Sequence, residues 1–138
     1  MPRSGLGIAD MAESIQAAGG ALEFTAISEW DLSGAQFRGV RFSTTLDNAV
    51  HVASVTAAAI VGIVQNKPTS GHAARIRTHG MTKAIAGAAI TRNDRVDCDA
   101  QGYFRTAVGS NYAGYAMQTV VASGTFTMIL QPQFAGAA

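Results

Sequence analysis

The chain has 138 residues, a length typical of one compact domain with a short arm and too short for two full domains. Ten basic and nine acidic side chains give a net charge of +1, so we expect no sequence-independent binding of a polyanion such as DNA or RNA. The longest apolar stretch, 57–64, is far shorter than the roughly 20 residues that a membrane-spanning helix needs. We therefore expect neither a membrane span nor a secretory signal, and the single cysteine, Cys98, fits folding in a reducing cytoplasm.

Bulky apolar residues are scarce in this chain. Leu, Ile, Val and Phe together number 30, close to the share of about one-fifth below which chains tend to be disordered. A core with few bulky residues predicts that the folded state gains stability from neighbouring subunits or from a larger assembly. A partner that binds only the folded state increases the free energy of unfolding.

Residues 1–22 differ in character from the rest of the chain. Asp10 and Glu13 have the spacing of a helix capping box, Met11 and Ile15 lie on one helical face, and glycines follow at 19–20. A helix this short is marginal in isolation. Two interpretations stay open for residues 1–22: a mobile tail, or an arm that orders against a partner.

From residue 21 onward the composition favours β structure. Val, Ile and Thr total 31 residues, whereas Leu, Glu and Lys total only 10. Glycine-bearing turns separate ten predicted strands: 21–27, 36–43, 49–55, 58–65, 73–79, 82–86, 94–98, 103–107, 112–121 and 125–131. Segment 75–79 alternates polar and apolar residues, so its basic side chains should face outward. The alanine-rich run 54–59 also suits a buried helical turn, but its β-branched neighbours favour a strand.

One short pattern occurs twice. Segment 60–65, followed by Gly71, resembles segment 112–118, followed by Gly124, and both Gln-to-Gly spacings equal six. Each copy precedes an alternating strand, which suggests one strand-loop-strand unit used twice, although two copies this short also arise by chance.

Cys98 is the strongest nucleophile by residue type, but it stands between Asp97 and Asp99, whose charges disfavour a thiolate. The Gly-x-Ser-x-Gly elbow of serine hydrolases is absent. Segment 97–102 resembles the first half of a calcium loop, yet Val108 stands where a closing glutamate is required. We predict a buried or idle thiol, a hairpin turn over 97–102 and no enzymatic activity.

The three histidines, His51, His72 and His79, include no pair at helical metal-site spacing, and the chain has no cysteine pair. We therefore predict no catalytic residue, no metal site and no cofactor. His79 should face solvent together with Arg75 and Arg77.

The large aromatic residues lack the dense basic interleaving of a nucleic-acid platform. They are Trp30, Phe37, Phe42, Phe104, Phe126 and Phe134. We interpret them as core residues, with one alternative. Trp30, which stands between Glu29 and Asp31, is also a candidate interface anchor, a role in which tryptophan is enriched.

Six short segments stand out by their order and spacing: 32–37 (LSGAQF), 62–68 (GIVQNKP) with Gly71, 80–84 (GMTKA), 94–96 (DRV), 99–102 (DAQG) and 114–117 (GYAM). Together they resemble the capsid cement or head decoration family of tailed bacteriophages. The resemblance spans about residues 30–131. Family members often carry Gly-Asp-x-Val where this chain has Asn93 before Asp94, a difference confined to a turn.

The resemblance implies a small β-barrel or β-tulip-like domain over residues 23–138, preceded by an arm over 1–22. It implies a decoration protein that binds the outer surface of an expanded phage head, bridges major capsid proteins and forms homotrimers there, after synthesis in the host cytoplasm. Candidate interface residues are Ile8, Met11, Ile15 and Trp30. A competing hypothesis is a small ligand- or glycan-binding module that acts in virion attachment through Arg75, Arg77 and His79.

Overall fold

The computed structural model describes residues 22–54, 59–109 and 111–133, and within these ranges the chain is all β with no helix. Nine strands follow in chain order: β1 (Leu22–Ser28), β2 (Gly39–Phe42), β3 (Ala49–Val52), β4 (Gly62–Val64), β5 (Ala73–Ile85), β6 (Arg95–Cys98), β7 (Phe104–Thr106), β8 (Tyr112–Ala116) and β9 (Thr125–Gln133). The all-β prediction is confirmed. Within the described ranges, no helix is long and apolar enough to cross a membrane.

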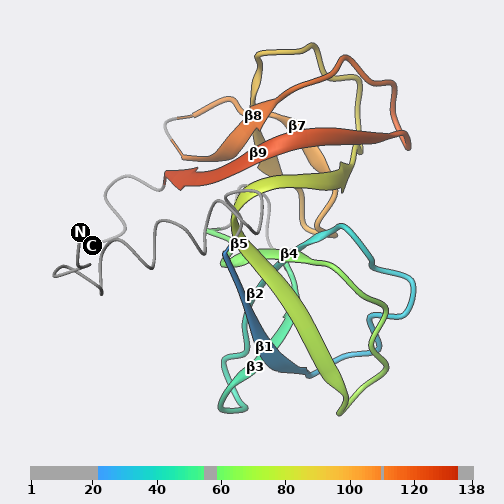
Figure 1. The fold of residues 1–138 in the computed structure, drawn as a ribbon, viewed down its shortest axis with the longest axis vertical. Helices are drawn as coiled ribbons and strands as arrows, with labels where there is room; N and C mark the ends of the chain where they lie inside the picture. The colour runs from blue at the N-terminus through green and yellow to red at the C-terminus, as the bar shows by residue number, and fades with distance from the viewer. Residues whose placement is uncertain (1–21, 55–58, 110, 134–138) are drawn as a thin grey trace, which may run out of the picture.

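The strands form two lobes that share β5 (Figure 1). In the lower lobe the pairing order β1-β3-β2-β4-β5 closes on itself, because β5 also pairs with β1. Only the β1–β3 pair is parallel among these ladders. The upper lobe continues from β5 in the order β9-β8-β6-β7, and a bridge from Ala86 to Phe104 brings β7 back to the residue after β5.

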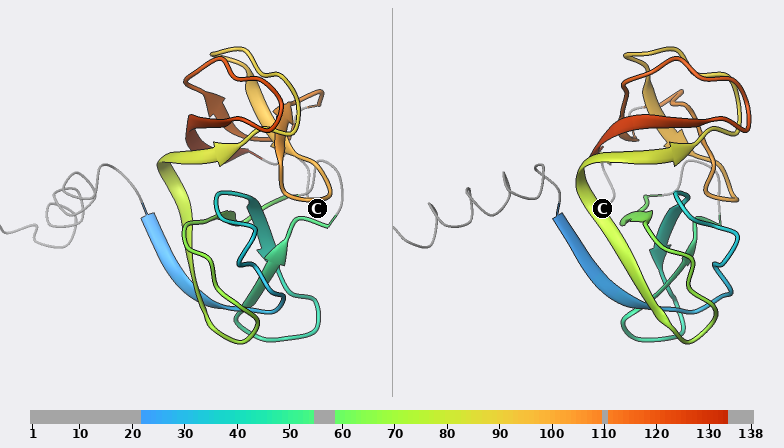
Figure 2. Two further views of the ribbon diagram at one scale, coloured as in Figure 1. Left: turned by 90° about the vertical axis from the view of Figure 1, so that its right-hand side faces the viewer. Right: turned by 45° about the vertical axis from the view of Figure 1, so that its right-hand side comes forward.

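Strand β5 belongs to both lobes. Its residues 73–79 pair with β1 and β4, and its residues 80–85 pair with β9. The prediction of separate strands at 73–79 and 82–86 is therefore wrong, because one strand of 13 residues covers both. Gly80, with φ of +105°, lets the backbone bend from one lobe into the other without interrupting the pairing (Figure 2).

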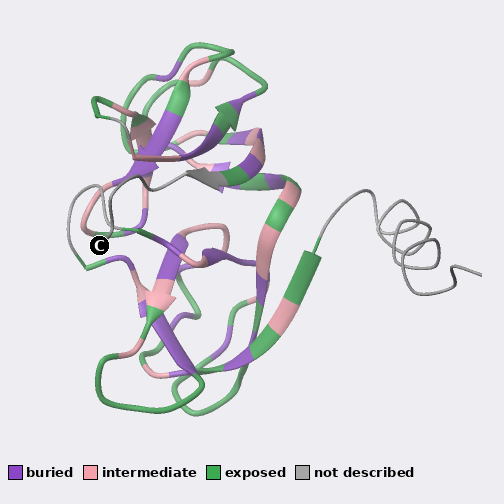
Figure 3. Ribbon diagram, turned by 90° about the vertical axis from the view of Figure 1, so that its left-hand side faces the viewer, coloured by how far each residue is buried: buried purple, intermediate pink, exposed green. Residues whose placement is uncertain are grey.

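Each lobe has its own apolar core. The lower core is built around Leu32, Val40, Val50, Val64 and Ile76, and the upper core around Phe104, Phe126, Met128 and Leu130. Ile60 and Ile63, from the lower lobe, pack with the upper core, so the two lobes are joined by buried side chains. Buried residues occur in both lobes and alternate with exposed ones along β5 (Figure 3).

Several strands are shorter than predicted. The strand expected over 36–43 begins at Gly39, because Phe37 has a φ of +68°, outside the extended region. The strand expected over 112–121 ends at Ala116, where residues 117–124 connect it to β9. The strands expected over 49–55 and 58–65 reduce to β3 and β4. Residues 55–58, most of the alanine-rich run, lie outside the described residues, as do 1–21.

The repeated pattern forms two equivalent hairpins. Strand β4 leads through residues 65–72 into β5, and β8 leads through 117–124 into β9, so both connections have eight residues. The glycine inside each copy faces the neighbouring backbone. A Cβ atom at Gly62 would lie 2.3 Å from the Arg77 carbonyl oxygen. A Cβ atom at Gly114 would lie 1.8 Å from the Ile129 carbonyl oxygen. The pattern therefore marks places where only glycine allows the two strands to approach.

Gly114→Ala should destabilise the protein by about 2 kcal/mol or more, because the added methyl group overlaps the β9 backbone. The free energy of unfolding from chemical denaturation measures this. Gly109→Ala is the matched control, since a Cβ atom there meets nothing within 4 Å, and its effect should stay within about 0.5 kcal/mol. Equal stability of the two variants would show that the strand contact is not tight.

Candidate functional site

Of the four predicted interface residues, the structure describes one. Ile8, Met11 and Ile15 lie outside the described residues, whereas Trp30 follows β1 and is 43% exposed. The expectation that Trp30 is a core residue is wrong, and its exposure agrees with the alternative of an interface anchor.

The Trp30 indole is held in a fixed position despite its exposure. It stacks on the His51 ring at a centroid distance of 4.1 Å and an interplanar angle of 18°. His51 is buried, its Nδ1 lies 2.7 Å from the Val52 carbonyl oxygen, and its Nε2 lies 3.9 Å from a Glu29 carboxylate oxygen. The Ser28 hydroxyl donates a hydrogen bond to the Trp30 carbonyl. An aromatic side chain ordered in this way loses little entropy on binding a partner.

The other aromatic residues divide between core and surface. Phe104 and Phe126 are buried, as expected for core residues, and their rings meet edge to face with a centroid distance of 6.3 Å. Phe42 is exposed, so the interpretation of Phe42 as a core residue is wrong. The centroid of its ring lies 5.9 Å from that of the Phe24 ring. Phe42 occupies the last position of β2 and pairs with Val50 of β3. Phe134 lies outside the described residues.

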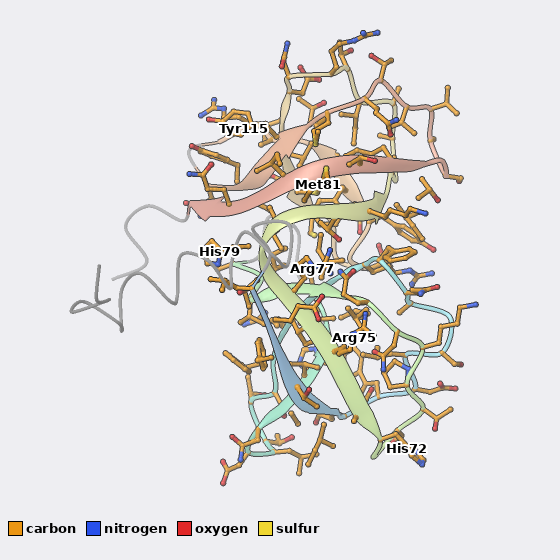
Figure 4. The ribbon with its side chains drawn as sticks, in the orientation of Figure 1. His72, Arg75, Arg77, His79, Met81 and Tyr115 are labelled. Atoms are coloured by element: carbon orange, nitrogen blue, oxygen red, sulfur yellow. The ribbon has the colours of Figure 1, made fainter. Side chains whose placement is uncertain are left out.

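The basic side chains of β5 are partly neutralised. Arg75 and His79 are exposed, as predicted, and Arg77 is half-buried (Figure 4). Glu23 on β1 lies opposite them, with its carboxylate 3.5 Å from Arg75 Nε and 2.9 Å from Arg77 Nε. Arg77 also donates to the Met81 carbonyl at 2.8 Å. The proposed anion or sugar site therefore contains a carboxylate and a tethered guanidinium, which weakens its attraction for an anion.

A row of outward-facing side chains crosses the upper lobe. Strand pairing aligns Arg95 with Tyr115, Tyr115 with Ile129, and Ile129 with Met81. Tyr115 is 38% and Met81 is 48% exposed, and both lie on the face shown in Figure 4. Sequence reasoning missed this row, because its four members come from four strands and only the pairing register brings them together.

Two hollows open where the lobes meet, and Phe37 lines both. The first has a volume of about 410 Å³ and is lined by Phe37, Gln65, Arg77, Met81, Thr82, Lys83 and Thr127. The second has a volume of about 350 Å³ and is lined by Ser33, Gly34, Gln36, Phe37, Lys67, Ile85 and Thr125. Most lining residues fall in segments 32–37, 62–68 and 80–84, the segments on which the family resemblance rests. These segments were therefore a sequence signal for the two hollows, but only the fold shows that they come together.

The hairpin turn predicted over 97–102 is present between β6 and β7 and covers residues 99–103, because 97–98 belong to β6. Asp99 Oδ1 accepts hydrogen bonds from the backbone N–H groups of Gln101 and Tyr103, and Gly102 has a φ of +84°. Asp97 is buried and accepts a 2.7 Å hydrogen bond from Arg105 Nε. The carboxylates that resembled calcium ligands are therefore occupied by protein donors. Among the described residues, no group of His, Cys, Asp and Glu side chains could hold a metal ion.

Cys98 is buried in the upper core, in agreement with the prediction of an idle thiol. Burial raises the pKa of the Cys98 thiol well above its ordinary value, and the charges of Asp99 and Asp97 raise it further. A thiol of this kind does not act as a nucleophile at neutral pH.

No protein-family model matches the chain, and no curated protein matches it in sequence. Among solved structures, the chain is similar to the N base of head fiber gp8.5 in bacteriophage phi29, with a TM-score of 0.64 and 16% sequence identity. The match covers 80% of this chain and 94% of that chain. At this level of identity the similarity shows that the two share a fold.

The buried thiol predicts a pH dependence of stability. In the unfolded chain Cys98 ionises near its ordinary pKa of 9.0, whereas in the folded protein it keeps its proton to higher pH. At pH values above about 9, the unfolded state binds fewer protons than the folded state, so the stability that the protonated thiol provides is lost as the pH rises. Cys98→Ala should therefore show a shallower decline in unfolding free energy between pH ~8 and ~10 than the parent protein. Identical slopes for the two proteins would contradict the pKa assignment.

Proposed function

We propose that this protein is a decoration protein of a phage head, which binds the outer surface of the expanded shell and stabilises it by bridging major capsid proteins. The fold shared with the N base of a phage head fiber is the observation that carries the proposal. The resemblance of segments across residues 30–131 to capsid cement proteins points to the same role.

The structure of the described residues fits a binding role. Two lobes present an ordered, exposed Trp30 on one and an outward-facing row from Arg95 to Met81 on the other. A decoration protein stabilises a shell because each bound copy adds interface free energy that must be lost before neighbouring capsid subunits separate. We propose Trp30 as one anchor, the arm residues Ile8, Met11 and Ile15 as a second contact, and a homotrimer as the bound form.

Co-sedimentation with heads of the phage that encodes the protein tests this function. The purified protein is mixed with expanded heads and with unexpanded heads, and bound copies per capsid subunit are counted. We expect saturable binding to expanded heads at a ratio set by the lattice. Absence of binding to both forms would overturn the decoration function and favour the virion-attachment hypothesis, which saturable binding to free glycans would then support.

Trp30→Ala should weaken binding to expanded heads at least about tenfold, because central tryptophans commonly contribute 2 kcal/mol or more to an interface. Its cost to folding should be no more than about 1.5 kcal/mol, the scale of the lost stacking on His51. Val121→Ala serves as the control, since Val121 is 73% exposed and lies on the other lobe. Unchanged head affinity of the Trp30 variant would remove Trp30 from the interface.

A further inference from the structure

The two hollows beside Phe37 concentrate the chain's amino groups. The sequence contains only two lysines, and each lines one hollow, Lys67 the second and Lys83 the first. Arg77 adds a guanidinium to the first hollow, and neither lining includes an acidic residue. The two hollows share Phe37, and we refer to them together as the Phe37 groove, which has one lysine in each hollow.

Within the described part of the chain, the two lysines differ from the arginines of β5 in their ion pairing. Across residues 22–54, 59–109 and 111–133, no carboxylate lies within ion-pair distance of Lys67 or Lys83, and both lysines are exposed. Arg75 and Arg77, by contrast, share the Glu23 carboxylate. Lys67 and Lys83 thus differ from the two arginines, whose charge the Glu23 carboxylate partly neutralises.

Phe37 is held in a conformation that a phenylalanine rarely adopts. Its φ of +68° costs on the order of 1 kcal/mol or more for a bulky side chain. The conformation is imposed by backbone hydrogen bonds, from Phe37 N–H to the Val64 carbonyl at 2.8 Å and from Arg38 N–H to the Ala35 carbonyl at 3.1 Å. Strain of this kind concentrates at binding sites, and here it occurs at the residue that lines both hollows.

The polar wall of the groove is formed before any ligand binds. Gln65 is buried, and its amide donates to the Ile63 carbonyl at 3.1 Å and to the Thr82 hydroxyl at 3.0 Å. Gln36 donates to the Gln65 carbonyl at 2.9 Å. These bonds tie the segment before β2 to β4 and β5. Met81, with Phe37, supplies an apolar surface next to the cations.

We propose that the Phe37 groove binds an extended, acidic protein segment whose carboxylates meet Lys67 and Lys83 and whose apolar side chains pack on Phe37 and Met81. Charge complementarity argues for the occupant: a lysine in each of two hollows that share an aromatic side chain matches an extended chain that alternates acidic and apolar residues. With a net charge of only +1, the chain does not favour a nucleic acid there. The inference that this segment belongs to the phage shell rests on the proposed function. The inference that the groove binds an acidic segment does not rest on it.

A peptide titration tests the chemistry of the groove. The probes are a short dye-labelled peptide that alternates glutamate with valine, the same peptide with glutamine in place of glutamate, and a single-stranded oligonucleotide of equal charge. We expect binding of the glutamate peptide only, weakened by added salt. The double variant Lys67→Gln, Lys83→Gln should bind it at least about tenfold more weakly, because two charge-assisted hydrogen bonds are lost.

The double variant Arg75→Gln, Arg92→Gln is the matched control, because it removes the same charge outside the groove linings and should bind like the parent protein. A thermal midpoint shared by all variants establishes that each is folded. Equal affinity for the glutamate and glutamine peptides, equal losses in the two double variants, or tighter binding of the oligonucleotide would each overturn the proposal.

Acylation of lysines followed by mass spectrometry extends the test to heads, since the chain has only two lysines. If the shell supplies the acidic segment, Lys67 and Lys83 react in the free protein and lose their reactivity on expanded heads. If the protein binds heads while both lysines react as before, the shell is not the source, and the decoration function stands without it. If the protein does not bind heads, the proposed function fails, and the peptide titration alone decides the groove.

Discussion

The long strand β5 is the element on which both lobes depend. Its first seven residues complete the lower ring by pairing with β1 and β4, and the next six begin the upper sheet by pairing with β9. Both sets of pairings survive because the strand bends at Gly80 rather than ending there, which requires a backbone conformation that glycine adopts without strain. One continuous strand thereby sets how the two lobes face each other.

The surfaces with binding potential follow from this arrangement. The Phe37 groove lies at the bend, where loop residues before β2 and after β4 approach the outer side of β5. The row from Arg95 to Met81 begins on the upper side of the same bend. Because both lobes are fixed to a shared strand, these surfaces keep a constant relative position.

Much of the strand pattern was predictable because it reflects local chemistry. The alternation at 75–79 predicted an extended segment with outward basic side chains, and Asp99 with Gly102 predicted the turn between β6 and β7. Errors arose where distant contacts override local preference. Gly80 suggested a turn between two strands, yet strand pairing on both sides of it keeps one continuous strand. Phe37 is held outside the extended region by the hydrogen bond from its backbone N–H to the Val64 carbonyl.

The sequence by itself determined the all-β class and the turn that follows Cys98, because composition and the spacing of turn residues are properties of neighbouring residues. Only the tertiary structure decided that Trp30 is exposed and stacks on His51, that Glu23 partly neutralises Arg75 and Arg77, and that Lys67 and Lys83 line two hollows that share Phe37. These contacts join residues far apart in the chain. Their distances are set by strand pairing and by the bend of β5, which no short stretch of sequence encodes.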